Sequence, residues 1–302
     1  MFYRLRTQLN KRWFDHRARG IFDTPPVRRH SGSPLVVLTM LHHPDLTMYM
    51  VAAKSFCRFV QPGRFVIVDD GLTADDRSLL SHHFEGISFI PRRSAGSPRT
   101  PQGGCWERLL SIADLNADSY VVQLDADTVT LQRPNEVLDC IAQDRSFTLG
   151  TKGGDRIIST EQASRIASGW QGDHVQVVAE QALHRLPEAI GARYVHGCAG
   201  FAGFHAGSLT RERVESVSKA MAQHVPAAKW AEWGSEQVTS NFIVANTPGA
   251  VILPPATYPF WAPGVHAASA RLVHFFGALR FQGGQYVASA AELARGLGGV
   301  GA

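Results

Sequence analysis

From residue 34 onward, the hydrophobic pattern of the chain switches repeatedly between the periods of strands and helices. Short apolar runs rich in β-branched residues predict four buried strands, at 35–41, 64–71, 86–91 and 119–127. Apolar residues at helical spacing predict helices between them, at 46–60, 73–84 and 105–115. Thr73 is the expected N-cap of the second helix, with Asp76 three residues later. This alternation predicts an α/β domain with a mainly parallel central sheet flanked by helices.

The second half of the chain is less regular. The stretch 194–208 alternates small and aromatic residues, and 232–246 has the pattern of a turn entering a helix. The run 272–281 resembles a strand interrupted by Gly277, and a helix is expected in the tail. The absence of a second complete βα series favours one domain over 34–282, followed by a helix and flexible tail over 283–302.

The first 33 residues form a basic arm and linker in this division. Phe2, Leu5, Leu9 and Trp13 recur at helical spacing, with arginines and a lysine between them. Such a helix either lies on an anionic membrane surface through residues 1–20 or packs on the domain or a partner with a solvated charged face. The second alternative is favoured. The Pro, Gly and Ser content of 24–34 indicates a linker.

Composition narrows the class of protein. The 302 residues are 44% apolar and 19% charged, which is typical of a globular protein. No apolar run approaches the ~20 residues that span a membrane, and no secretory signal is visible. Four widely spaced cysteines favour a reducing cytoplasm. The net charge of +4 comes from the first thirty residues, which argues against a nucleic-acid-binding face.

Two acids follow the fourth predicted strand, in VVQLDADTVTL. Asp125 and Asp127 come at the point where the chain turns, so both carboxylates can meet one cation. Oxygen ligands of this kind suit Mg²⁺ or Mn²⁺, particularly beside phosphates. The alternative is a pair of solvated turn aspartates, because the D-x-D pattern is weak alone.

LDADTVTL also fits the first motif of haloacid-dehalogenase-like phosphatases. In that case Asp125 is the nucleophile, Asp127 the acid/base, and Mg²⁺ lies beside both. This class needs a later lysine and an acidic pair. Lys152 and Asp155 are too close to fill both roles, and the segment 171–176 offers one acid. The phosphatase is therefore the second hypothesis.

Four separated stretches resemble glycosyltransferase family 8, which includes glycogenin and lipopolysaccharide galactosyltransferases. These stretches, spread over residues 34 to 282, are GCWERLL, LDADTVTLQRP, WGSEQVTSN and VHFFGALRF. The resemblance implies the GT-A type of nucleotide-sugar transferase fold. It implies a basic residue facing the donor at Arg108, and His274 as the third metal ligand after the two aspartates.

The same resemblance assigns the remaining site residues. Glu236 and Gln237 would lie at the donor sugar and its anomeric carbon. Gly277 would let the backbone approach the diphosphate, and Arg280 would grip it bidentately. Arg280, Phe281 and Glu236 replace the lysine, proline and aspartate of the family, which puts the pocket shape and the sugar preference in doubt.

Three further residues are candidates for the nucleoside. Thr39, Asp69 and Asp70 fall at predicted strand ends, where α/β sheets bind ligands. Paired acids before a glycine are also common in plain turns. The segment 196–204 would line the acceptor and donor channel, or alternatively pack beneath the sheet.

The sequence as a whole predicts a metal-dependent glycosyltransferase. It would move a hexose from a nucleotide diphosphate sugar, expected to be UDP-linked, to an acceptor hydroxyl, and family resemblance implies retention at the anomeric carbon. The acceptor would be a glycan, a lipid-linked sugar or a protein. The expected location is the cytoplasm or the inner membrane surface. Besides the phosphatase, a non-catalytic glycan- or membrane-binding module remains a hypothesis.

Overall fold

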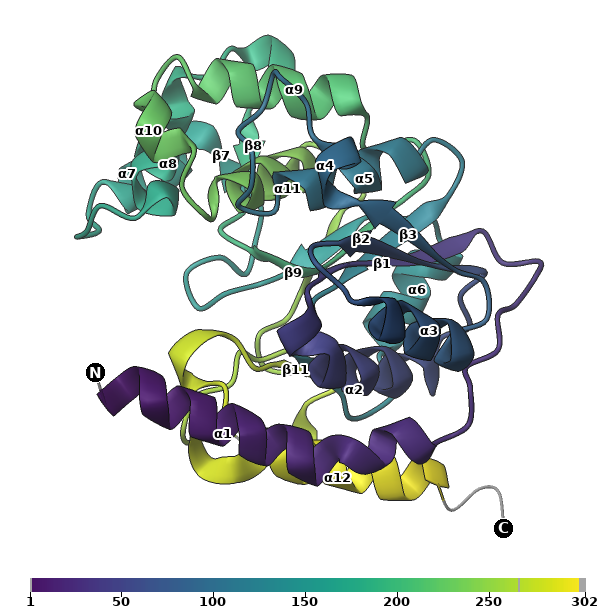
Figure 1. The fold of residues 1–302 in the computed structure, drawn as a ribbon. Helices are drawn as coiled ribbons and strands as arrows, with labels where there is room; N and C mark the ends of the chain where they lie inside the picture. Colours follow the sequence, from purple (N-terminus) through teal and green to yellow (C-terminus); the bar gives the residue numbers. More distant parts are fainter. Residues whose placement is uncertain (1, 266, 299–302) are drawn as a thin grey trace.

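The computed structural model describes residues 2–265 and 267–298 of the chain (Figure 1). Within these residues, a seven-stranded sheet has the order β10-β6-β9-β4-β1-β2-β3. Its strands are β1 (Leu35–Leu41), β2 (Arg64–Asp69), β3 (Ile87–Pro91), β4 (Tyr120–Leu124), β6 (Phe147–Leu149), β9 (Cys198–Phe204) and β10 (Val251–Leu253). β9 runs antiparallel to both of its neighbours, and the other pairs are parallel. The predicted mainly parallel α/β sheet is confirmed.

Helices cover both faces of the sheet (Figure 1). They are α1 (Phe2–Ala18), α2 (Leu46–Cys57), α3 (Ala74–His83), α4 (Arg92–Ala95), α5 (Trp106–Leu115), α6 (Asn135–Ala142), α7 (Thr160–Ala167), α8 (Val175–Ala182), α9 (Arg211–Met221), α10 (Ala227–Trp230), α11 (Ser235–Ala245) and α12 (Gln285–Gly298). None of these described helices is long and apolar enough to cross a membrane.

Alternation along β1 explains why the strand sequence is apolar throughout. Leu35 and Val37 belong to one hydrophobic cluster, and Val36 and Leu38 belong to a second cluster on the opposite face. A strand covered by helices on both faces buries every side chain, so it reads as a continuous apolar run. Thr73 caps α3 together with Asp76 in a reciprocal capping box, as predicted.

The basic N-terminal helix packs on the domain. Phe14 and Ala18 of α1 are fully buried, and the Phe14 ring lies 4.3 Å from the Tyr286 ring of α12. α1 and α12 run side by side along one side of the molecule (Figure 1). The two ends of the chain therefore complete one hydrophobic core, and the favoured alternative for the arm is confirmed.

Two small antiparallel sheets complete the fold. β5 (Thr128–Thr130) pairs with β11 (Leu272–His274), and β7 (Ile158–Ser159) pairs with β8 (Arg193–Tyr194). The prediction of a strand over 272–281 is wrong beyond His274, where β11 ends. The chain turns there into a short 3₁₀ helix that begins at Gly277, which has φ +61°.

Candidate active site

Asp125 and Asp127 lie in the turn that joins β4 to β5. The amide and hydroxyl of Thr128 both donate to the carbonyl of Asp125, at 3.3 and 2.9 Å, and these bonds close the turn. Asp125 and Asp127 are two residues apart, so their side chains would share one face along a strand, and in this turn both still lie beside His274. β11 then pairs with β5 and places His274 opposite Thr128.

The three side chains converge on one point. Asp125, Asp127 and His274 each offer a ligand atom, and these atoms lie within 4.8 Å of one another. Nε2 of His274 is 3.0 Å from Oδ1 of Asp127. Two carboxylates and an imidazole are a donor set that accepts Mn²⁺ or Mg²⁺. Among the His, Cys, Asp and Glu side chains of the described residues, these three form a group that could hold a metal ion.

Gly200 of β9 forms one wall of this cluster. A β-carbon at this position would lie 2.3 Å from Cε1 of His274 and 3.0 Å from Oδ2 of Asp125. A glycine is therefore required for the imidazole and the carboxylate to approach each other over the strand. Together with the donor set, this fitted space indicates that the residues suit a divalent cation.

Charge interactions inside the cluster are strong because Asp127 and His274 are buried and Asp125 is half-buried. Burial raises the pKa of Asp125 to about 6, although the Arg108 guanidinium opposes that shift. Burial would also raise the pKa of Asp127, but His274 and Arg280 outweigh it and the pKa is lowered. Burial would lower the pKa of His274, yet the Asp127 carboxylate raises that pKa well above its usual range. A bound cation would replace the imidazolium proton, since imidazole ligates in its neutral form.

Arg108 joins the metal-ligand side of the site to the sugar side. It is buried on α5, where Nη1 donates to Oδ1 of Asp125 at 2.5 Å and Nη2 donates to Oε1 of Glu236 at 2.6 Å. Glu236 is 3% exposed at the start of α11, and burial raises its pKa against the charge of Arg108. Glu236 is therefore a buried, paired carboxylate, which excludes the simple role of a solvated acid at a helix start.

Arg280 and Gln237 are also brought to this site. Nη2 of Arg280 donates to Oδ2 of Asp127 at 2.5 Å, and its Nε donates to the carbonyl of Phe275. Oε1 of Gln237 accepts from the amide of Ala199 at 3.0 Å. Gly277 lies in the exposed turn just before Arg280, and nothing lies within 4 Å of a β-carbon built on it.

The three proposed nucleoside residues are engaged elsewhere. Thr39 is buried, and its hydroxyl donates to the carbonyl of Leu124. Asp69 accepts from the amides of its own turn and pairs with Arg77, and Asp70 pairs with Arg92. Thr39 thus contacts the residue directly before Asp125, whereas the bonds given for Asp69 and Asp70 lead to their own turn and to Arg77 and Arg92.

Sequence reasoning did not single out Cys198. Its Sγ lies 3.8 Å from Nδ1 of His274, on the side of the imidazole opposite Asp127. Its place in the small-residue stretch 196–204 was the available signal, but that stretch alone does not say which residue meets the imidazole.

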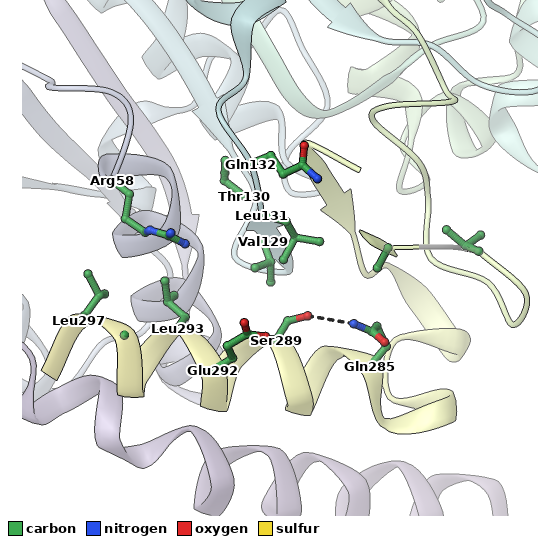
Figure 2. Close-up of a pocket in the computed structure, with 13 residues that line it drawn as sticks. Arg58, Val129, Thr130, Leu131, Gln132, Gln285, Ser289, Glu292, Leu293 and Leu297 are labelled. Atoms are coloured by element: carbon green, nitrogen blue, oxygen red, sulfur yellow. Dashed lines mark hydrogen bonds between the residues drawn. The ribbon is translucent and has the colours of Figure 1, made fainter. Parts of the chain in front are cut away.

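A well-formed cavity of the described residues lies away from this cluster. It has a volume of about 690 Å³ and lies between β5, α12 and the end of α2, lined by Arg58, Leu131, Gln285, Ser289 and Glu292 among others (Figure 2). Within the described residues, its lining includes none of the candidate site residues. The chemistry of the Asp125 cluster, not cavity size, therefore identifies the candidate site.

Comparison with known proteins yields likeness in fold only. No protein-family model matches the chain, and no curated protein matches it. Among solved structures, the galactosyltransferase LgtC in complex with donor and acceptor sugar analogs is 13% identical. That likeness covers 87% of this chain and 96% of LgtC, with a TM-score of 0.47.

Two further solved structures are similar at the same level. The bifunctional glycosyltransferase WbbM is 14% identical over 83% of this chain and 47% of its own, with a TM-score of 0.49. Mouse xyloside xylosyltransferase 1 is 11% identical over 80% of this chain and 96% of its own, with a TM-score of 0.43. Likenesses this distant carry no conclusion about activity, so the function must be argued from the site.

Proposed function

We propose that this protein is a GT-A type glycosyltransferase that moves a hexose from a UDP-linked sugar to an acceptor hydroxyl. The observation that carries the proposal is the convergence of Asp125, Asp127 and His274 beside the buried Arg108 and the half-buried Arg280. A divalent cation bound there would neutralise charge on a departing diphosphate. The sequence resemblance to family 8 supports the choice of donor and a retaining outcome.

Each residue of the candidate site has a separate role in this proposal. Asp125, Asp127 and His274 hold Mn²⁺ or Mg²⁺. Arg108 and Arg280 already carry positive charge at this point, so they add to the attraction for a diphosphate.

The sugar side of the site is assigned to α11. Glu236 receives hydroxyls of the donor sugar, because its second oxygen is free of the bond to Arg108. Gln237 has its carbonyl fixed by Ala199, which leaves the amide N–H groups to donate near the anomeric carbon. Thr39, Asp69 and Asp70 stay proposals for the uridine side.

The first prediction concerns metal-dependent nucleotide binding. UDP and Mn²⁺ together should raise the melting temperature, whereas either alone should raise it less. Asp127→Asn keeps the side-chain shape and should weaken the joint binding by more than about tenfold. Loss of a residue that only supports a metal ligand already lowers metal affinity by about tenfold or more, and Asp127 is proposed as a ligand itself. Calorimetric titration with UDP in Mn²⁺ measures the loss.

Asp139→Asn, on an exposed face of α6, is the matched control and should bind like the wild type. No shift with UDP and Mn²⁺ in the wild type would remove the main support for a transferase. Mg²⁺-dependent release of phosphate from simple phosphomonoesters would instead favour the phosphatase with Asp125 as nucleophile.

We also propose that the acceptor lies at the inner surface of the cytoplasmic membrane. The face of α1 opposite the buried Phe14 exposes Leu9 (55%) and Trp13 (48%). Arg12 and Arg17 are exposed on the same helix. Apolar side chains among arginines suit an anionic lipid surface, and each arginine contributes about 1 kcal/mol of binding there.

The second prediction tests this surface. Vesicles that contain phosphatidylglycerol should sediment the protein, and phosphatidylcholine vesicles should not. Arg12→Glu with Arg17→Glu should lower binding by more than about thirtyfold, from the loss of about 2 kcal/mol. Arg165→Glu with Arg185→Glu carries the same charge change in a distant part of the fold and should bind normally. Equal loss in both double variants would mean that net charge, not α1, governs binding.

A further inference from the structure

A buried carboxylate outside the cation cluster holds two side chains. Glu180 of α8 is 1% exposed. Its Oε1 accepts from the Tyr194 hydroxyl at 2.8 Å, and its two oxygens lie 2.7 and 2.9 Å from Nδ1 of His196. Because a carboxylate only accepts hydrogen bonds, Nδ1 carries a proton and Nε2 of His196 is left as the acceptor of the ring.

The imidazole of His196 is fixed but not enclosed. Its side chain is 28% exposed. The ring meets the Trp170 indole edge to face at 4.7 Å. The hydroxyl of Thr151 donates to the carbonyl of His196 at 2.6 Å, which also holds the backbone. The Glu180–Tyr194 bond alone would connect α8 to the strands, so a half-buried, oriented imidazole needs a further explanation.

The chain connects His196 directly to the segment that contacts the sugar side of the site. His196 precedes Cys198 by two residues, so their α-carbons lie no more than about 7 Å apart. Cys198 contacts His274, and the next residue, Ala199, donates to Gln237. The carbonyl of Gly197 accepts from Asn241 of α11, which anchors the segment between the two centres.

We infer that His196, Glu180 and Trp170 form a subsite for a sugar acceptor. Nε2 of His196 accepts a hydrogen bond from an acceptor hydroxyl, and the Trp170 ring packs on the apolar face of the sugar. Glu180 orients the imidazole. His196 is thus a positioning residue for the acceptor, and this role rests on the proposed transferase function. It narrows the acceptor class to a sugar and disfavours a simple protein side chain.

The test uses histidine-labelled full-length protein with UDP and diamagnetic Mg²⁺. The His196 Cε1–H signal is assigned by its loss in His196→Gln. Methyl β-galactoside, methyl α-glucoside, methyl α-mannoside and methyl N-acetyl-β-glucosaminide are added in large excess, one at a time. At least one should shift the His196 signal and leave the signal of His205, another half-buried histidine beside a carboxylate, in place.

Variants separate binding from structure. Trp170→Ala should weaken the sugar titration about three- to tenfold, as expected from loss of an aromatic contact. Glu180→Gln should weaken it while UDP and Mn²⁺ still raise the melting temperature as in the wild type. His184→Gln, at an exposed histidine of the same region, is the matched control and should titrate normally.

Each result either supports or overturns the acceptor subsite. If no sugar moves the His196 signal while UDP binds with metal, the subsite is overturned and the transferase proposal stands. If a sugar binds equally well to His196→Gln and Trp170→Ala, the cluster is only a structural tie and the inference is wrong. If UDP fails to bind but a sugar moves His196, the subsite stands and the chain is a glycan-binding module.

Discussion

At the residue scale, Arg108 compensates the charges of two carboxylates of the candidate site. Its guanidinium is buried and bonded to both Asp125 and Glu236, two carboxylates whose pKa is raised by burial and lowered by the charge of Arg108. Removing one partner of a buried ion pair leaves the other charges without compensation, which is costlier than never burying them. Arg108 therefore stabilises the folded site as well as offering charge to the donor.

Arg108→Met should lower the free energy of unfolding by about 3–5 kcal/mol, the range for breaking a buried ion pair. Urea denaturation measures it. Arg211→Met is the matched control, because Arg211 pairs with Asp114 at the surface, where the two side chains are 33% and 49% exposed, and its loss should cost no more than about 1 kcal/mol. Equal losses in the two variants would show that the buried pairing does not govern stability.

At the scale of the element, α6 ends in a way that its sequence does not favour. Asp144 follows the helix with φ +48°, where glycine is the preferred residue. The amide of Arg145 donates to the carbonyl of Cys140 at 2.8 Å, as in a Schellman ending. The fold thus imposes a left-handed residue on an L-amino acid with a β-carbon.

Asp144→Gly and Asp144→Ala both remove the carboxylate and differ only in the β-carbon. The glycine variant should be more stable than the alanine variant by about 1 kcal/mol, the cost of left-handed backbone for an L-residue. Thermal unfolding followed by circular dichroism compares the two. A more stable alanine variant would mean that this helix end relaxes out of the left-handed conformation.

At the scale of the whole molecule, the N-terminal arm is joined to the domain around His83. This histidine is 1% exposed at the end of α3, and its carbonyl accepts from the amide of Val27. Burial lowers the pKa of His83 to about 4, and the charges of Lys54 and His82 add to the shift. Protonation of His83 therefore opposes the packing that joins arm and domain.

The folded pKa of His83 lies below its unfolded value, so the unfolded chain binds more protons between about pH 6.5 and pH 4. Stability should fall as the pH drops through this window, by up to about 3 kcal/mol from this group. His83→Phe should remove that part of the pH dependence in urea denaturation, and His82→Phe at the exposed neighbour is its control. An unchanged slope in His83→Phe would assign acid sensitivity to other groups.

The local elements of the α/β core follow from the amino-acid sequence. The periods of strands and helices depend on residues close in sequence. The strand at 35–41 and the helix at 105–115 could therefore be assigned from the hydrophobic pattern alone. The position of Asp125 and Asp127 at the end of a strand follows from the same pattern. Even the helical character of the arm was visible in the spacing of its apolar residues.

Which side chains meet depends on the packing of the folded chain. Asp127 and His274 are 147 residues apart, and they meet because β11 pairs antiparallel with β5 in one register. The bonds from Arg108 to two carboxylates and from Glu180 to His196 depend in the same way on how helices pack on the sheet. The period of apolar residues in the sequence predicts that one face of an element is buried. Which element packs against that face depends on strand order, register and close packing across the whole chain.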